Sequence, residues 1–336
     1  RIGRLSMSFT PQHYEEMSQR LNQVKQEIGQ FIVGQQEAVD FTLYSVLADG
    51  HALLEGLPGL GKTMLIRTIS DVLDLSFSRI QFTPDLMPSD ITGTSMIERT
   101  DEGKQNFSFR EGPIFSQMVL ADEINRATPK TQSALLEAMG EKTVTVLGDT
   151  KQMARPFFVL ATQNPIEMEG TYPLPEAQMD RFLCKIHVNY PTKEELKEIV
   201  LRTTGAKVIQ LEKVMNADDL IIAQEMVKEV LIADDMLDYA IDLILATHPN
   251  QDATDDVKQY VQYGSGPRGL QSLIRLAKAR ALVAGRYHVS IADIKSVATP
   301  ALRHRMLLNY EGEAEGKTVD SILESLLQTI KQGQIS

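Results

Sequence analysis

Cysteine and tryptophan are almost absent from this chain of 336 residues, which contains a single cysteine, Cys184, and no tryptophan. One thiol excludes an intrachain disulfide framework and a cysteine-rich metal site. Because Cys184 lies in an apolar, strand-like run, we expect it to be a small residue of the core. The sequence also lacks an apolar run of the roughly 20 residues that would span a bilayer, and no signal-peptide pattern opens it. The expected class is a cytoplasmic enzyme or binding protein.

A basic block or tail is missing as well, and the formal net charge is −11. Proteins that bind nucleic acids cluster Lys and Arg against the phosphates, so this balance argues weakly against wholesale nucleic-acid binding, although a local basic groove is compatible with it. Hydrophobic residues make up 43% of the chain and charged residues 24%, which is ordinary for a soluble globular protein. The length indicates two domains, and one or three are compatible with it.

Short apolar runs alternate with helical patterns over the first part of the chain. After a flexible arm, helices are expected over 15–28 and 37–48. The expected strands are 51–56, 77–82, 117–122, 156–162 and 181–188. Continuous apolar strands that alternate with helices indicate a parallel sheet covered on both faces. The predicted fold class is therefore α/β.

The pattern changes near residue 190 and is helical from there on. Thr192 and Glu195 form a capping box, as do Ser290 and Asp293. Helices are expected over 193–203, 217–231, 234–247, 268–284 and 290–298. The predicted parts are an arm and helix over 1–30, an α/β domain over 31–190 and a smaller all-helical domain over 191–336.

The stretch GLPGLGKT, residues 56–63, matches G-x-x-x-x-G-K-[ST] at every fixed position between an expected strand and a helix over 64–73. Glycines in such a loop let backbone N–H groups surround phosphate oxygens at the helix N-terminus. Lys62 would reach the β- and γ-phosphates, and the Thr63 hydroxyl would ligate Mg²⁺. The predicted nucleotide-binding residues of the loop are Gly56, Pro58, Gly59, Leu60, Gly61, Lys62, Thr63 and Met64.

Two carboxylates, Asp122 and Glu123, end the apolar run 117–122. They are expected at the carboxyl end of a buried strand, where ligands of open α/β sheets lie. Asp122 would hold Mg²⁺ through water, and Glu123 would polarise the attacking water as general base. The sequence has no N-K-x-D motif for guanine, which favours ATP. A helix capped by Thr128 and Pro129 is expected next.

Five motifs, taken in order, resemble those of AAA+ ATPases and specifically of the MoxR family: GLPGLGKT, ADEINRA, ATQNP, EAQMDRF and GSGPRG. The resemblance covers roughly residues 30–300 and implies a P-loop NTPase sheet followed by a helical lid. It implies that Asn164 is a sensor that orients the lytic water, from a strand between the catalytic strand and the phosphate-loop strand. Arg268 would be a second sensor at the γ-phosphate. FIVGQ resembles the segment that packs against adenine, through Ile32 and Val33.

Simpler interpretations of these residues also exist. Asn164 could be a turn residue before Pro165, and Arg268 a surface arginine, although a cation near a helix N-terminus is electrostatically disfavoured. Asp180 and Arg181 could form a local ion pair at the end of a strand. The resemblance instead implies that Arg181 is an arginine finger that reaches the γ-phosphate bound by a neighbouring subunit, with Asp180 orienting it.

Two inserted hairpins are expected within the α/β domain. TSMIER and NFSFR, with a turn at 101–103, form one inside an insert over about 84–113. The second, over about 142–156, has its turn at 148–149. In related ring ATPases such hairpins point toward the central pore or a client, and the alternative is that they decorate the surface.

The resemblance implies a homo-oligomeric ring, expected to be hexameric, that remodels partner proteins in the manner of MoxR chaperone-like ATPases. It further implies partners with von Willebrand factor A domains and assistance with metal-cofactor insertion or complex maturation. The alternatives are a magnesium-chelatase-like motor subunit, a DNA-directed AAA+ motor and a nucleotide-gated scaffold without turnover. The acidic balance counts against the DNA motor, and the presence of Glu123, Asn164 and Arg181 counts against the scaffold.

Overall fold

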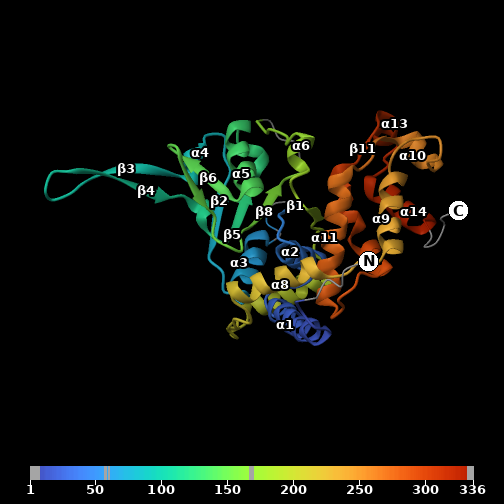
Figure 1. Cartoon of the computed structure of the whole chain (residues 1–336), viewed down its shortest axis with the longest axis horizontal. Helices are drawn as coiled ribbons and strands as arrows, with labels where there is room; N and C mark the ends of the chain where they lie inside the picture. Colours follow the sequence, from blue (N-terminus) through green and yellow to red (C-terminus); the bar gives the residue numbers. More distant parts are fainter. Residues whose placement is uncertain (1–7, 57–58, 60, 166–169, 331–336) are drawn as a thin grey trace, which may run out of the picture.

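A five-stranded parallel sheet forms the centre of the molecule, in the strand order β2-β5-β8-β1-β9 (Figure 1). The computed structural model describes residues 8–56, 59, 61–165 and 170–330. The strands are β2 Phe77–Gln81, β5 Met118–Asp122, β8 Phe158–Gln163, β1 Ala52–Glu55 and β9 Cys184–His187. The predicted parallel sheet is confirmed. All five carboxyl ends share one edge, which is where such sheets bind ligands.

Helices cover both faces of the sheet because successive side chains of each strand point to opposite sides. On β5, Met118 and Leu120 belong to one apolar cluster, and Val119 and Ala121 belong to the other. The first cluster takes in α1 Pro11–Gly29, α2 Gln36–Leu47, α3 Lys62–Val72 and α8 Ala217–Glu229. The second takes in α4 Pro88–Thr92 and α5 Pro129–Glu141.

Helix α1 begins at Pro11, earlier than the predicted start at residue 15. Thr10 caps it: the Thr10 hydroxyl accepts from the backbone N–H of His13, and the His13 ring accepts from the backbone N–H of Thr10. Pro at the first helical position suits this start. The prediction missed it because a histidine, and not Glu or Gln, completes the capping box.

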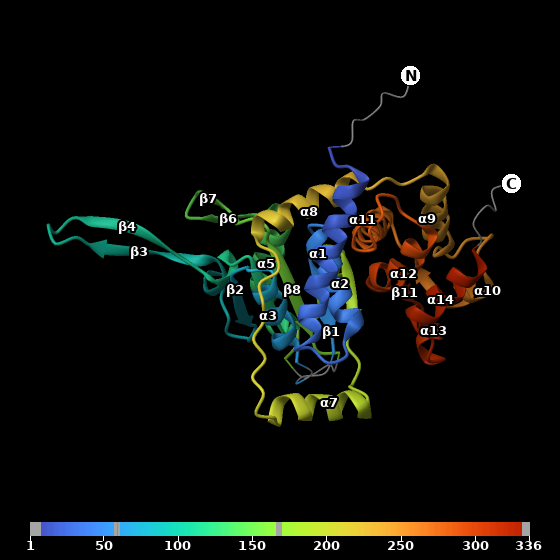
Figure 2. The same ribbon diagram turned by 90° about the horizontal axis from the view of Figure 1, so that it is seen from below.

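Two antiparallel hairpins leave the sheet domain on the same side (Figures 1 and 2). The long one pairs β3 Gly93–Arg99 with β4 Gln105–Glu111, and the short one pairs β6 Thr143–Val146 with β7 Asp149–Gln152. The turn of the short hairpin is at Leu147 and Gly148, with φ of 50° and 87°, one residue before the prediction. Positive φ at both central residues gives the turn the twist that a hairpin needs.

As far as residue 330, where the described part of the chain ends, the C-terminal part is mainly helical. It also contains a short antiparallel pair, β10 Val261–Tyr263 with β11 Leu307–Leu308, and an isolated parallel bridge between Leu231 and His288. The capping boxes of Thr192 with Glu195 and of Ser290 with Asp293 are both present. Its helices, besides α8, are α7 Lys193–Thr204, α9 Asp234–Ala246, α10 Asp255–Tyr260, α11 Pro267–Val283, α12 Ile291–Leu302, α13 Tyr310–Ala314 and α14 Val319–Thr329. None of the helices within the described ranges is long and apolar enough to cross a membrane.

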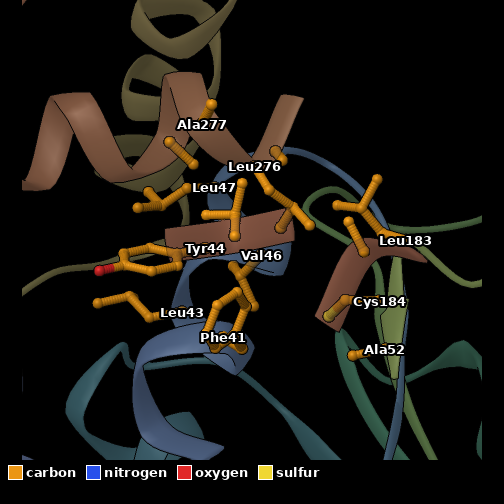
Figure 3. Packing of buried hydrophobic residues seen from close by; sticks show 14 of the residues in the cluster. Phe41, Leu43, Tyr44, Val46, Leu47, Ala52, Leu183, Cys184, Leu276 and Ala277 are labelled. Carbon is orange, nitrogen blue, oxygen red and sulfur yellow. The ribbon is translucent and has the colours of Figure 1, made fainter. Parts of the chain in front are cut away.

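The C-terminal helices share their core with the sheet domain. Helix α11 packs on α1, α2 and α8, and α12 packs on β9. Figure 3 shows Leu276 and Ala277 of α11 beside Leu47 of α2, with Leu183 and Cys184 close by. Apolar contact is therefore continuous across the predicted domain limit near residue 190.

Candidate nucleotide-binding site

The phosphate loop joins β1 to α3 and leaves the first turn of α3 open to a ligand. Gly59 and Gly61 have φ of 82° and 77°, a backbone conformation that glycine adopts without strain. Gly61 is the N-cap of α3 and its first N–H groups receive no side-chain cap. Such N–H groups and the helix dipole form an anion site. The predicted residues Pro58 and Leu60 lie outside the described ranges.

Lys62, the first residue of α3, turns back toward the loop, and its amine donates to the Gly56 carbonyl at 2.8 Å. Burial lowers the pKa of Lys62, while the carboxylates of Asp122, Glu123 and Glu55 act in the opposite direction. The amine thus lies at the carboxyl edge of the sheet, within the field of the acidic residues. Next along α3, Thr63 is partly buried and Met64 is exposed.

The side chain of Thr162 on β8 links Asp122, the predicted Mg²⁺ ligand, to Glu123, the predicted general base. Its hydroxyl donates to the Asp122 carboxylate at 2.7 Å and accepts from the backbone N–H of Glu123 at 2.9 Å. The other Asp122 oxygen accepts from Arg79 of β2 at 2.7 Å. Neighbouring strands therefore hold Asp122 from both sides. Neither Thr162 nor Arg79 was predicted, because their contacts depend on the strand order.

Glu123 follows β5 in the left-handed conformation, with φ of 55°. Residues other than glycine adopt this region rarely, and mostly where the surroundings enforce it. Its carboxylate lies 3.3 Å from the guanidinium of Arg126. Asn164 comes directly after β8, the strand between β5 and β1, as the resemblance implied for the sensor position. Asn164 and Glu123 thus follow adjacent strands at the same edge.

The donor set at this edge fits Mg²⁺ that binds together with a nucleotide. Within the described part of the chain, no group of three or more His, Cys, Asp or Glu side chains could hold a metal ion by itself. Mg²⁺ commonly uses one or two protein oxygens and completes its shell with phosphates and water. The Asp122 carboxylate and the Thr63 hydroxyl are oxygen donors of that kind.

A mainly apolar cavity of about 550 Å³ adjoins the phosphate loop. Ile32 and Val33 line it with the loop glycines 59 and 61, and Leu196 and Ile199 of α7 line it too. Arg202 of α7 donates to the Gly29 and Gln30 carbonyls at 2.9 and 2.7 Å and so ties α7 to the end of α1. An apolar cavity beside a phosphate site suits a flat base. The contribution of α7 was not predicted.

Arg181 lies against α5, in the turn before β9. Its guanidinium donates to the Leu136 carbonyl at 2.9 Å. A Cβ on Gly140 would come within 2.9 Å of the same guanidinium nitrogen. Arg181 was predicted to begin the last strand, but β9 begins at Cys184, so Arg181 belongs to the turn before it.

Asp180 does not orient Arg181, and that expectation was wrong. The Asp180 carboxylate accepts from Arg305 at 2.7 Å and lies 3.6 Å from Arg268. Arg305 is 125 residues further along the chain, so local sequence gives no sign of the pairing. Arg268 is the second residue of α11, and its side chain is 63% exposed. The ion pair of Asp180 is therefore made with the C-terminal part.

Comparisons with known proteins agree with this arrangement. A family profile described as the ATPase family associated with various cellular activities (AAA) matches residues 51–184, and one described as an AAA lid domain matches residues 253–326. Chaperone MoxR1 of Mycobacterium tuberculosis is 43% identical over 311 residues, which are 92% of this chain and 81% of that protein. The chain belongs to the MoxR family of AAA+ ATPases.

Other relatives extend the MoxR-family likeness over nearly the whole chain. Protein MoxR of Paracoccus denitrificans is 30% identical and covers 89% of this chain and 92% of its own length. The uncharacterised protein YeaC of Bacillus subtilis is 42% identical over a stretch that covers 95% of this chain and 97% of YeaC. The crystal structure of an ATPase candidate from Cytophaga hutchinsonii has a TM-score of 0.88 at 42% identity, covering 95% of this chain and 96% of that one. The predicted AAA+ fold with its lid is confirmed.

In this MoxR-family chain a second cavity, of about 420 Å³, brings Arg181 and Arg268 together. Gly50 and Leu183 also line it, and they precede β1 and β9. The cavity therefore lies at the amino ends of these strands. The phosphate loop begins at Gly56, at the other end of β1, and the segment from Gly50 to Gly56 spans about 20 Å at about 3.3 Å per residue. The two arginines lie at the sheet edge opposite the phosphate loop of their own subunit.

Proposed function

We propose that this chain is a magnesium-dependent ATPase that works as a closed homo-oligomeric ring, expected to be hexameric, and remodels partner proteins as a chaperone. The observation that supports a ring is the location of Arg181 and Arg268. Both lie at the edge of the sheet opposite their own phosphate loop. The chaperone role is supported by the relative Chaperone MoxR1, which is named for that activity. Clients with von Willebrand factor A domains, and help with metal-cofactor insertion, remain part of the proposal.

Each residue of the site has a task that its position favours. The N–H groups at the start of α3 and the Lys62 amine bind the phosphates. Bound Mg²⁺, held by Thr63 and Asp122, would offset the charge that develops on the transferred phosphoryl group. Glu123 polarises the attacking water, and Asn164 orients that water from the adjacent strand. Ile32 and Val33 pack on the adenine ring.

Arg181 and Arg268 would act on the nucleotide of the neighbouring subunit. A guanidinium that cannot reach its own phosphate loop becomes useful when a second copy brings its loop to the basic cavity. There it stabilises the charge of the transition state, a contribution worth about 10³–10⁵ in turnover for arginine fingers. Turnover thus requires two subunits, one that binds ATP and one that supplies arginines.

Assemblies of two different variants test whether one subunit binds ATP while its neighbour supplies the arginines. Arg181→Ala is expected to bind ATP with nearly unchanged affinity and to lose about 10³-fold in turnover. Lys62→Ala is expected to lose ATP binding. Mixing the two should restore part of the activity, because Lys62→Ala subunits still present Arg181 to intact phosphate loops. Steady-state ATPase assays and nucleotide-binding titrations, with EDTA to test the magnesium requirement, provide the measurements.

A double variant, Lys62→Ala with Arg181→Ala, is the matched control, since it enters the same assemblies without an arginine to offer. Native mass spectrometry reports whether mixed rings form and how many subunits they contain. If mixed rings form and activity does not return, the action of Arg181 on a neighbour is refuted.

A further inference from the structure

The guanidinium of Arg305 holds the short segment in which Arg181 lies. Its Nε donates to the Asp180 carboxylate at 2.7 Å. One terminal nitrogen, Nη2, donates to the Asp180 and Phe182 carbonyls at 3.0 and 2.7 Å. The other, Nη1, donates to the carbonyls of Leu183 at 3.1 Å and Ala301 at 2.6 Å. All five N–H donors of an arginine are thus in use, four of them on residues 180–183.

The hydrogen bonds that Arg305 makes to residues 180–183 are buried. The Arg305 side chain is only 4% exposed. Residues 180–183 form a turn and bends between α6, Glu176–Met179, and β9. Buried carbonyls need hydrogen-bond partners, and Arg305 donates to those of three of these four residues, while the His304 ring also pairs with the Phe182 carbonyl at 2.9 Å. The remaining residue is Arg181, whose side chain projects to α5.

The same guanidinium also lies beside the start of α11, which carries Arg268. A Cβ on Gly269 would meet the Arg305 side chain at 3.1 Å. The Asp180 carboxylate joins the two arginines, at 2.7 Å from Arg305 and 3.6 Å from Arg268. Arg305 follows α12 in the lid, so one lid residue contacts the segments that present both Arg181 and Arg268.

We propose that Arg305 is a positioning residue that fixes Arg181 and Arg268 relative to each other, so that one subunit presents them together to the nucleotide of the next. The inference rests on the proposed action of Arg181 on a neighbouring subunit. Arg305 does not touch the nucleotide in this role. It sets the backbone from which the finger projects, and a misplacement of about 1 Å at a catalytic group can cost about 100-fold in rate.

Arg305→Gln removes most of the hydrogen bonds to residues 180–183, which together we call the clamp, and keeps a neutral polar side chain. We expect ATP affinity to stay within about twofold, because the phosphate loop is at the opposite edge, and turnover to fall about 10- to 100-fold. The matched control is Arg286→Gln. Arg286 also forms an ion pair, with the buried Asp293 inside the lid, but no hydrogen bond or ion pair joins it to residues 180–183. Its turnover should stay near that of the wild type at a temperature where both variants are folded.

Complementation separates lost positioning from general damage. Arg305→Gln subunits keep an intact phosphate loop, so mixing them with Lys62→Ala subunits should restore turnover, whereas the Lys62→Ala, Arg181→Ala double variant should not restore it. If Lys62→Ala rescues Arg181→Ala but not Arg305→Gln, the positioning role is wrong while the action between subunits stands. If it rescues neither in mixed rings, both proposals are wrong.

A second variant, Arg305→Lys, tests the proposal if Arg305→Gln does not fold or assemble. Arg305→Lys keeps a positive charge for Asp180 but lacks the planar fork that reaches several carbonyls at once. We expect intermediate turnover that Lys62→Ala subunits raise in the same way. Turnover of Arg305→Lys equal to that of the wild type would overturn the proposal, because a clamp that needs five donors cannot work with three.

Discussion

His51 shows how a single buried side chain makes the sheet sensitive to acid. It lies just before β1, accepts from the backbone N–H of Val159 through Nδ1 at 3.0 Å, and pairs through Nε2 with the Met139 carbonyl at 3.2 Å. Only the neutral ring with a proton on Nε2 satisfies both contacts. Burial lowers the pKa of His51 to about 4.

The sign of the resulting pH dependence follows from linkage. Between pH 6.5 and about 4 the unfolded state binds a proton at His51 that the folded state does not, so the free energy of unfolding falls as the pH falls through this window. The contribution of His51 is about 3 kcal/mol at most. His51→Gln should be less stable at about pH 7.5 and should lose less stability on acidification, as measured by urea unfolding at a series of pH values.

His288→Gln serves as the control, because His288 is exposed. His304, whose pKa burial also lowers, acts in the same direction in all three proteins and cancels in the comparison. An unchanged acid dependence in His51→Gln would contradict the assignment.

At the residue scale, sequence predicts contacts that neighbours in the chain make and misses those made by distant parts. Gly61, Lys62 and Thr63 belong to one local motif between a strand and a helix, so their positions could be predicted together. Arg305 reaches Asp180 across 125 residues, and no local pattern encodes that pairing. Arg79 could not be predicted as a partner of Asp122 without the strand order.

At the scale of a single element, helix α5 contains a glycine, Gly140, near its C-terminal end. Gly140 is exposed and helical, and glycine costs a helix about 0.5–1 kcal/mol relative to alanine. The neighbour of Gly140 is the guanidinium of Arg181. The glycine therefore leaves room for Arg181 to lie against α5, at a cost in helix stability.

Gly140→Ala should separate stability from activity. The free energy of unfolding should rise by about 0.5–1 kcal/mol, because only the end of a flexible side chain must move. Turnover should fall severalfold, because Arg181 loses its place over the Leu136 carbonyl. Ser133→Ala, at an exposed position of the same helix, should leave turnover unchanged. An active and more stable Gly140→Ala protein would show that the place of Arg181 on α5 is irrelevant.

The long hairpin was predictable as an element, because alternating strands and a turn at 101–103 encode it locally. Its direction was not, since that depends on contacts at its base, such as the Lys151 amine over the Phe109 ring at 4.8 Å. Near its tip Ile97 and Phe107 pair across the strands and are 57% and 76% exposed. An exposed apolar pair on a projecting hairpin favours a role in client binding over a surface hairpin without a binding role.

At the scale of the whole molecule, we expect the proposed ring, with ATP bound, to retain client proteins through this hairpin. Glu123→Gln should bind ATP without turnover and retain partner proteins from its own cell extract. Adding Ile97→Ser and Phe107→Ser should reduce the retained protein at least severalfold, as quantified by mass spectrometry. Adding Tyr310→Ser, which removes an 87% exposed aromatic from the lid, is the control. Equal retention by both would assign client binding to another surface.

The apolar core that joins α11 and α12 to α2 and β9 has a mechanical consequence. Parts of a chain that share a large apolar interface do not move independently. We expect a lid joined in this way to move together with its sheet domain and not to close over its own nucleotide like a hinged cover. In the proposed ring, hydrolysis would then change the orientation of whole subunits relative to one another, a motion that a single subunit cannot show.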